Sequence, residues 1–162
     1  MGPGACRSRC YAPGVPFTIR VRVEATDLDE LEHANNQVYL RWVQEAAVAH
    51  SEAVGLGLAG YRQRGAVFVV KRHEVDYIRP ALAGDELDVG TQVCTAGPAS
   101  AERYTTIQRV ADAELLARAV TRWAFVDLRS GRPVRIPDEV RSRFEIEPVE
   151  AGIAGRRRGR GS

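Results

Sequence analysis

Two aspartates, a histidine and two asparagines lie close together in the sequence, just before a segment with helical periodicity. They are Asp27, Asp29, His33, Asn35 and Asn36. The first amide hydrogens of a helix have no intrahelical acceptor and favour nearby negative charge. A carboxylate beside them could attack a carbonyl or activate water, while the amides hold the charge that develops on oxygen. The pattern indicates acyl transfer, although Asp and Asn are also ordinary capping residues at a helix start.

The segment that follows predicts one long helix over residues 37–54, with Asn35 or Asn36 as its N-cap and Gly55 as its C-terminal stop. Its apolar residues recur at spacings of three and four. Many of them are alanines, so another surface can approach closely, and we expect the helix to lie against a sheet. The preceding residues 24–36 fit no regular element.

Five segments predict β-strands. Residues 17–23 alternate apolar and polar side chains, and four more segments are rich in β-branched and aromatic residues: 66–78, 87–93, 103–110 and 115–127. A glycine-rich connection spans 55–65, and a short helix is expected from Pro137 towards Phe144. Short turns imply antiparallel pairing. The predicted fold is α+β, with about five antiparallel strands covered by the long helix, and leftover sheet surface or an edge strand is expected to pair with a second copy.

The composition excludes several classes of protein. The chain has 162 residues, 44% hydrophobic and 27% charged, which is typical of one globular domain. A net charge of +2 gives no field for nucleic-acid binding, and no apolar run reaches bilayer length, so we expect a cytoplasmic protein without a membrane segment. Three cysteines, an odd count, do not favour a disulfide framework. Cys6 and Cys10 are spaced like two metal ligands, but the His and Cys partners that would complete a tetrahedral site are not nearby, and no nucleotide loop is visible. We expect a disordered lead-in at 1–16, a folded domain at 17–147 and a disordered basic tail at 148–162.

The stretch 27–42, followed by Glu45-Ala46, closely resembles a known family signature. That signature, Asp-x-Asp-x-x-Gly-His-Val-Asn-Asn-x-x-Tyr-Leu, belongs to the 4-hydroxybenzoyl-CoA thioesterase-like family of hot-dog proteins. Residues 76–80 and 84–87 resemble a strand end and turn of the same family. The resemblance covers about residues 17–129. It implies a hot-dog fold, in which an antiparallel sheet wraps around one long helix, and a homodimer or homotetramer.

The resemblance also implies hydrolysis of an acyl-CoA or acyl-carrier-protein thioester without a cofactor. By position Asp29 is the catalytic carboxylate, acting as nucleophile or general base. The backbone amide of Asn36 matches the group that polarises the carbonyl, and His33 either orders the loop or contacts the substrate. Glu45, on the helix, is an alternative carboxylate. Glu32 replaces the family's glycine, and a glutamate is strained at a positive φ, so the geometry of this loop is open.

Candidate substrate contacts are Tyr39 and Glu45 on the helix and three basic residues, Lys71, Arg72 and Arg79, near the phosphates of a coenzyme A or carrier-protein arm. A basic residue on a strand is equally often the solvent-facing half of the alternation. Trp42 and Trp123 fit the core or an acyl pocket. Two other functions stay open: a hot-dog hydratase or dehydratase, and a catalytically silent dimer that binds acyl thioesters. The identity of the acyl group is not readable from the sequence.

Overall fold

The computed structural model describes residues 16–146. Its elements are β1 (Phe17–Arg22), a short 3₁₀ turn (Ala25–Asp27), α1 (Asn36–Ala53), α2 (Leu58–Arg64), β2 (Ala66–Tyr77), β3 (Glu86–Ala96), β4 (Ser100–Arg109), β5 (Leu115–Asp127) and α3 (Asp138–Arg141). The expected basic tail, and the lead-in apart from Pro16, lie outside the described residues. No helix within residues 16–146 is long and apolar enough to cross a bilayer.

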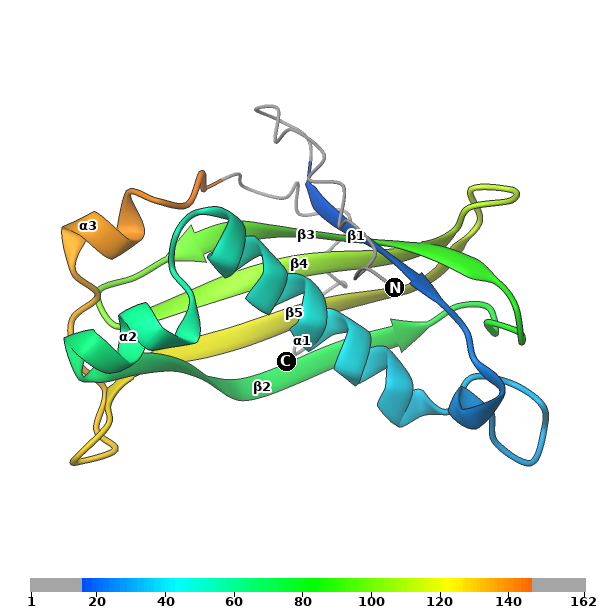
Figure 1. The fold of residues 1–162 in the computed structure, drawn as a ribbon, viewed down its shortest axis with the longest axis horizontal. Coiled ribbons are helices and arrows are strands. Elements are labelled where there is room, and N and C mark those ends of the chain that lie inside the picture. Colours follow the sequence, from blue (N-terminus) through cyan, green and yellow to red (C-terminus); the bar gives the residue numbers. More distant parts are fainter. Residues whose placement is uncertain (1–15, 147–162) are drawn as a thin grey trace, which may run out of the picture.

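The five strands form one antiparallel sheet in the order β1-β3-β4-β5-β2, which confirms the predicted α+β arrangement. α1 crosses one face of the sheet, while α2 and α3 lie at the end where α1 finishes (Figure 1). β2 is an edge strand and runs in the opposite direction to α1 (Figure 1). The beginning of β2 therefore lies near the end of the helix, and the end of β2 lies near its beginning.

The core consists of two apolar clusters. The first lies under the first half of α1, where Tyr39, Trp42 and Val43 pack on the inward residues of β3, β4 and β5. Ala46 is fully buried there, as expected where a helix approaches a sheet closely. The second cluster lies between α2, α3 and the sheet and includes Leu56, Tyr61, Phe125, Ile136 and Val140.

A row of buried and half-buried polar side chains also lies between the inner face of the sheet and α1. Thr105 donates to Thr91 at 3.1 Å, His73 bonds Thr121 at 2.9 Å, and Arg103 bonds His50 at 2.9 Å. Pairing these groups offsets the cost of removing them from water. Burial, and then the Arg103 charge, hold the pKa of His50 at about 4. His50 is therefore neutral near pH 7.

Several boundaries differ from the sequence prediction. α1 begins at Asn36 because the side chain of Asn35 accepts the amide of Gln37 at 2.9 Å, which makes Asn35 the N-cap. The segment 55–65, predicted as a connection, contains the short helix α2. Its Gly57 and Gly60 obscured the helical pattern. β3 and β4 are also longer than expected, because each continues through small and polar residues that carry little β signal.

Candidate active site

The loop between the 3₁₀ turn and α1 closes on itself. The amide of Asp29 donates to the carbonyl of His33 at 2.8 Å, and the amide of Glu32 donates to the carbonyl of Asp29 at 3.0 Å. Glu32 takes a φ of 59°, the left-handed conformation that suits glycine. The loop thus adopts the conformation that glycine would favour, with a glutamate in place, at a cost of about 1 kcal/mol.

Asp29 is exposed and uses one of its two carboxylate oxygens to hold this loop. Its Oδ1 accepts the amide of Leu31 at 2.9 Å and the amide of His33 at 3.3 Å. Its Oδ2 accepts no hydrogen bond from the residues described, 16–146. The side chain is therefore fixed through one oxygen and presents the other to solvent or to a ligand.

The start of α1 leaves one amide available beside this loop. The side chain of Asn35 takes the amide of Gln37, and its carbonyl takes the amide of Val38 at 2.9 Å. Asn36 is the first residue of the helix, and within residues 16–146 its amide makes no hydrogen bond. A helix of 18 residues adds its dipole at this position. The Asn36 N–H can therefore stabilise negative charge on a ligand oxygen.

The first aspartate of the pattern, Asp27, has a structural role. It is 3% exposed, its Oδ2 accepts the amide of Glu24 at 3.0 Å, and its Oδ1 accepts Arg41 at 2.8 Å. Its carbonyl accepts the amide of Asn35 at 2.8 Å. Arg41 also forms an ion pair with Glu45 one turn further along α1, at 3.5 Å. Glu45 is exposed, and the neighbouring Arg41 guanidinium offsets its negative charge.

His33 and Tyr39 connect the loop to the turn that follows β2. His33 pairs with Leu82 through an isolated β-bridge, so its backbone orders the loop. Tyr39 is 2% exposed and its hydroxyl accepts the amide of Ala81 at 2.9 Å. Burial raises the pKa of Tyr39, so the phenol stays neutral. This position in the core gives Tyr39 a supporting role.

The three basic candidates are all exposed, and two have partners. Arg72 pairs with Glu74 at 3.0 Å, and Arg79 pairs with Glu114 at 3.4 Å. Lys71 lies at the bulge in β2 and forms no ion pair among residues 16–146. The solvent-facing interpretation accounts for all three. Of these three residues, Lys71 is the one without an ion-pair partner among residues 16–146.

Exposed apolar side chains surround the loop of Asp29. Leu31 is 73% exposed, and Leu82, the β-bridge partner of His33, is 44% exposed. Tyr77 is 45% exposed, and its hydroxyl donates to the carbonyl of Asn36 at 3.2 Å. Single exposed apolar side chains are common on protein surfaces, so these three do not by themselves define a binding surface.

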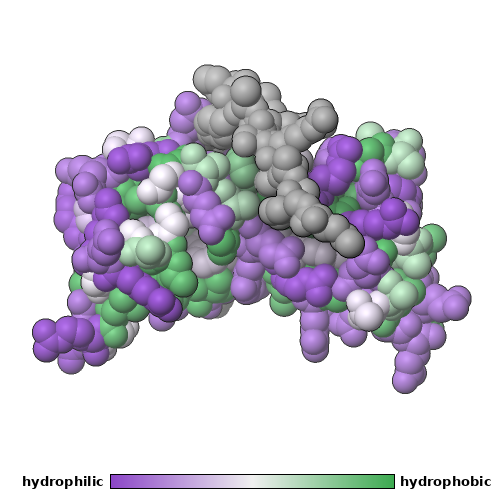
Figure 2. Space-filling model, in the orientation of Figure 1, coloured by the Kyte–Doolittle hydropathy of each residue, from purple (hydrophilic) through white to green (hydrophobic). Residues whose placement is uncertain are grey.

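A cavity of about 210 Å³ lies at the other end of α1. It is mainly apolar, partly open to solvent, and lined by the last turns of α1, by α2, by the sheet and by the segment from α3 to Ile146. Its aromatic lining residues are Tyr61, Phe68, Trp123 and Phe144. Figure 2 shows apolar residues among polar ones at the end of the molecule where α2 and α3 lie. The sequence left Trp42 and Trp123 open between the core and such a pocket; Trp42 lies in the core and Trp123 lines the cavity. The rest of the lining was missed because it is assembled from α1, α2, the sheet and the segment 136–146, which are far apart in the sequence.

The cavity is distant from Asp29 of the same chain. Its first lining residue on α1, Ala47, lies about 16 Å along the helix axis from Asn36, at 1.5 Å per residue. Among residues 16–146 no group of three or more His, Cys, Asp or Glu side chains is placed to hold a metal ion.

Comparisons with known proteins agree with this architecture. The family described as the thioesterase-like superfamily matches residues 23–144. The long-chain acyl-CoA thioesterase of Escherichia coli K12 is 24% identical over 129 residues, which cover 78% of this chain and 95% of that protein. A chloroplast palmitoyl-acyl carrier protein thioesterase of Cuphea hookeriana is 28% identical over 141 residues, covering 83% of this chain. The chain spans only 34% of the length of that plant relative.

Solved structures of thioesterases also resemble this chain. A thioesterase of Thermus thermophilus, complexed with coenzyme A and Zn, is 32% identical with a TM-score of 0.69, over 82% of this chain and 95% of that one. A 1,4-dihydroxy-2-naphthoyl-CoA thioesterase of Synechocystis shares the fold, with a TM-score of 0.73 at 23% identity, over 78% and 93%. The expected hot-dog fold is confirmed. The chain belongs to the thioesterase-like superfamily.

Proposed function

We propose that this protein hydrolyses acyl thioesters of coenzyme A or acyl-carrier protein to the free acid and the thiol. The observation that carries the proposal is the carboxylate of Asp29, held through Oδ1 by two loop amides with Oδ2 left open, immediately before the helix start where the Asn36 amide is available. Membership of the thioesterase-like superfamily and the relatives acting on acyl-CoA and acyl-carrier protein support it.

The two groups supply what thioester hydrolysis requires. The substrate's carbonyl oxygen accepts the Asn36 N–H, which stabilises the oxyanion that forms when the carbonyl carbon is attacked. Oδ2 of Asp29 either takes a proton from the attacking water or attacks the carbon itself. In the first case the thiolate leaves and receives a proton. In the second, the thiolate leaves, and is protonated, as the bond between Oδ2 and the acyl carbon yields a mixed anhydride. Water then hydrolyses the anhydride, which releases the acid and regenerates Asp29. Neither route needs a cofactor.

The geometry of β2 favours a site shared by two copies of the chain. β2 is a 12-residue edge strand, and an unpaired edge of this length favours pairing. If two β2 strands pair antiparallel about a two-fold axis, the end of one faces the beginning of the other. The Asp29 loop of one copy then lies opposite the cavity of the second copy. Within one chain the helix start and the cavity are about 16 Å apart, and this arrangement brings the helix start of one copy next to the cavity of the other.

The polar outer face of the sheet favours a dimer over a tetramer built back to back. The outer face of the sheet carries arginine–carboxylate ion pairs, including Arg118 with Asp76 at 2.7 Å and Arg122 with Glu102 at 2.8 Å. Such a face is suited to water.

The cavity of the second copy then receives the acyl group, since aromatic and aliphatic side chains line it. A cytoplasmic location stays a prediction from the sequence.

The first experiment measures thiol release from a panel of short, long, aromatic and β-keto acyl-CoAs, followed by acyl-carrier-protein substrates. Asp29→Asn and Glu45→Gln are assayed beside the wild type. We expect turnover by the wild type, loss of most of it in Asp29→Asn, and little change in Glu45→Gln. Failure of the wild type on every thioester would favour the silent binding dimer, and selective loss in Glu45→Gln would move the catalytic role to that carboxylate.

A mixing experiment tests the shared site. Val48 is 53% exposed at the cavity lining, so Val48→Trp should obstruct entry without disturbing the core. Asp29→Asn subunits keep an open cavity, and Val48→Trp subunits keep the carboxylate. If each site combines both copies, an equimolar mixture that exchanges subunits recovers up to about a quarter of wild-type activity, because half of the dimers carry one intact site. No recovery, with exchange verified by mass, would place the whole site within one chain.

A further inference from the structure

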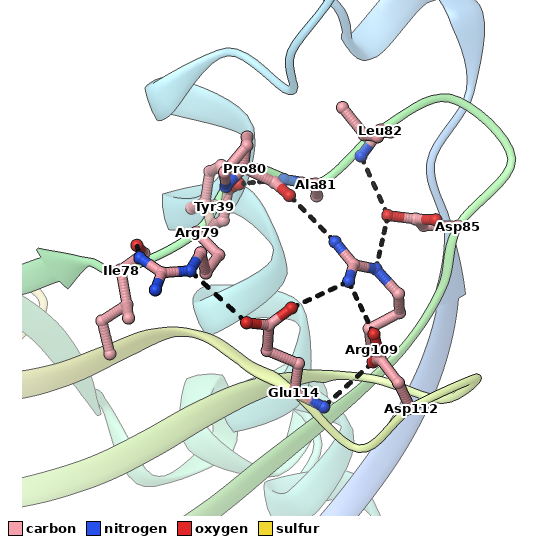
Figure 3. Close-up of polar contacts among 10 residues, drawn as sticks. All are labelled: Tyr39, Ile78, Arg79, Pro80, Ala81, Leu82, Asp85, Arg109, Asp112 and Glu114. Atoms are coloured by element: carbon pink, nitrogen blue, oxygen red, sulfur yellow. Dashed lines mark hydrogen bonds and ion pairs between the residues drawn. The ribbon is translucent and has the colours of Figure 1, made fainter.

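Arg109, at the end of β4, joins three carboxylates and a backbone carbonyl (Figure 3). Its Nε bonds Oδ2 of Asp85 at 3.0 Å, and its Nη1 bonds Asp112 at 2.9 Å and Glu114 at 3.1 Å. Its Nη2 donates to the carbonyl of Pro80 at 3.2 Å. The side chain is only 17% exposed. Each arm of the planar guanidinium is thus used, in a geometry that a lysine cannot reproduce.

Two of these four partners belong to the turn between β2 and β3. Besides Arg109, Oδ2 of Asp85 accepts the amide of Leu82 at 3.0 Å, and the carbonyl of Asp85 accepts the amide of Val23 at 2.9 Å. Pro80 lies at the other end of the same turn. Arg109 therefore fixes both ends of the turn 80–85 to the hairpin of β4 and β5, on which Asp112 and Glu114 lie (Figure 3).

The turn 80–85 in turn holds the Asp29 loop and the first turns of α1. The carbonyl of Ala81 accepts the amide of Ala34 at 2.9 Å, and Leu82 pairs with His33. The amide of Ala81 donates to the hydroxyl of Tyr39 on α1. A chain of contacts thus runs from Arg109 through the turn to both groups that the proposed hydrolysis uses, although Arg109 contacts neither of them.

We propose that Arg109 is a positioning residue for hydrolysis, which fixes the turn 80–85 and through it the relative placement of the Asp29 carboxylate and the Asn36 amide. This inference rests on the proposed function. Removing the guanidinium leaves Asp85, Asp112 and Glu114 as neighbouring negative charges, which repel one another, and frees the carbonyl of Pro80. The turn then moves away from the loop. A shift of about 1 Å at a reacting group is enough to cost roughly 100-fold in rate.

The test compares Arg109→Gln and Arg109→Lys with a matched control, Arg118→Gln. Arg118 also lies on the β4–β5 hairpin and forms an ion pair with a carboxylate, Asp76, but on the outer face of the sheet away from the turn. We expect Arg109→Gln to lower kcat about 10- to 100-fold with KM changed less than about 3-fold, and Arg109→Lys to recover part of the loss. Arg118→Gln should stay near the wild type.

Hydrogen exchange supplies a readout that does not depend on activity. In Arg109→Gln, exchange of the amides in residues 28–36 should rise more than exchange in β1 or in the body of α1, whereas Arg118→Gln should leave residues 28–36 unchanged. A uniform rise, or unchanged kcat in a folded Arg109→Gln, would overturn the proposal. If Arg109→Gln does not fold, Asp85→Asn takes its place with the same expectations. If exchange at residues 28–36 rises in Arg109→Gln but the wild type cleaves no thioester, the proposed function is refuted, while the role of Arg109 in positioning the loop still stands.

Discussion

Asp27 and Asp29 lie two positions apart in the sequence, but the structure predicts a larger loss of stability when Asp27 is removed than when Asp29 is removed. In Asp27→Ala, the protein loses the hydrogen bond to Arg41 at 2.8 Å and the capping bond to the amide of Glu24 at 3.0 Å, at a side chain that is 4% exposed. A hydrogen bond to a charged group contributes roughly 1.5–3 kcal/mol and a cap about 1 kcal/mol.

Arg41 is 51% exposed and is rehydrated when its partner is removed, so the ion pair contributes at the lower end of that range. We expect Asp27→Ala to lower the free energy of unfolding by about 2 kcal/mol, or the unfolding midpoint by about 4–8 °C. Urea denaturation, followed by circular dichroism, measures this change in the free energy of unfolding. Asp29→Ala, which loses only exposed loop contacts, is the matched control and should lose about 1 kcal/mol or less. A loss below about 0.5 kcal/mol in Asp27→Ala would refute the structural role of this carboxylate.

The strained backbone, the buried histidine and the support of the loop each yield one more prediction. Glu32→Gly should raise the free energy of unfolding by about 1 kcal/mol because φ is 59°, and Ala113→Gly, at φ 58°, is a second positive-φ position with which to compare it; an unchanged unfolding midpoint in both would contradict the strain. Burial lowers the pKa of His50 to about 4, so the unfolded chain binds a proton first, and stability falls as pH drops from 6.5 towards 4, by on the order of 3 kcal/mol in total. His50→Gln should flatten that pH dependence in denaturant titrations, and an unaltered slope would argue against a neutral His50. Tyr39→Phe leaves the buried amide of Ala81 without its acceptor and should cost about 1–3 kcal/mol in the same measurement, a prediction that a stability equal to the wild type would contradict.

Most of the fold was predictable from the sequence because its elements carry strong periodicity. α1 differs from the predicted helix by one residue at each end, and β5 has the predicted bounds. Both elements bury one face against the core, so their apolar residues repeat regularly. α2 was missed because it has only seven residues, and its helical state depends on the packing of Tyr61 in the second cluster rather than on local propensity.

The candidate site was predictable only in its local part. The motif indicated Asp29, His33 and Asn36 as candidates, because the loop and the helix start are contiguous in the chain. The cavity and the Arg109 cluster were not found. Each is assembled from residues that are far apart in the sequence, and an arginine at a strand end has no local signal that distinguishes it from a solvent-facing one.

The central claim is that Asp29 performs the chemistry, and one ratio tests it most directly: the rate of thiol release by Asp29→Asn relative to Glu30→Gln, on the best acyl thioester of the wild type. Glu30 is the adjacent exposed carboxylate, so both variants remove one negative charge from the same loop. We predict that Asp29→Asn loses at least about 100-fold in kcat while remaining folded, and that Glu30→Gln stays near the wild type. Equal rates in the two variants would contradict the assignment of Asp29.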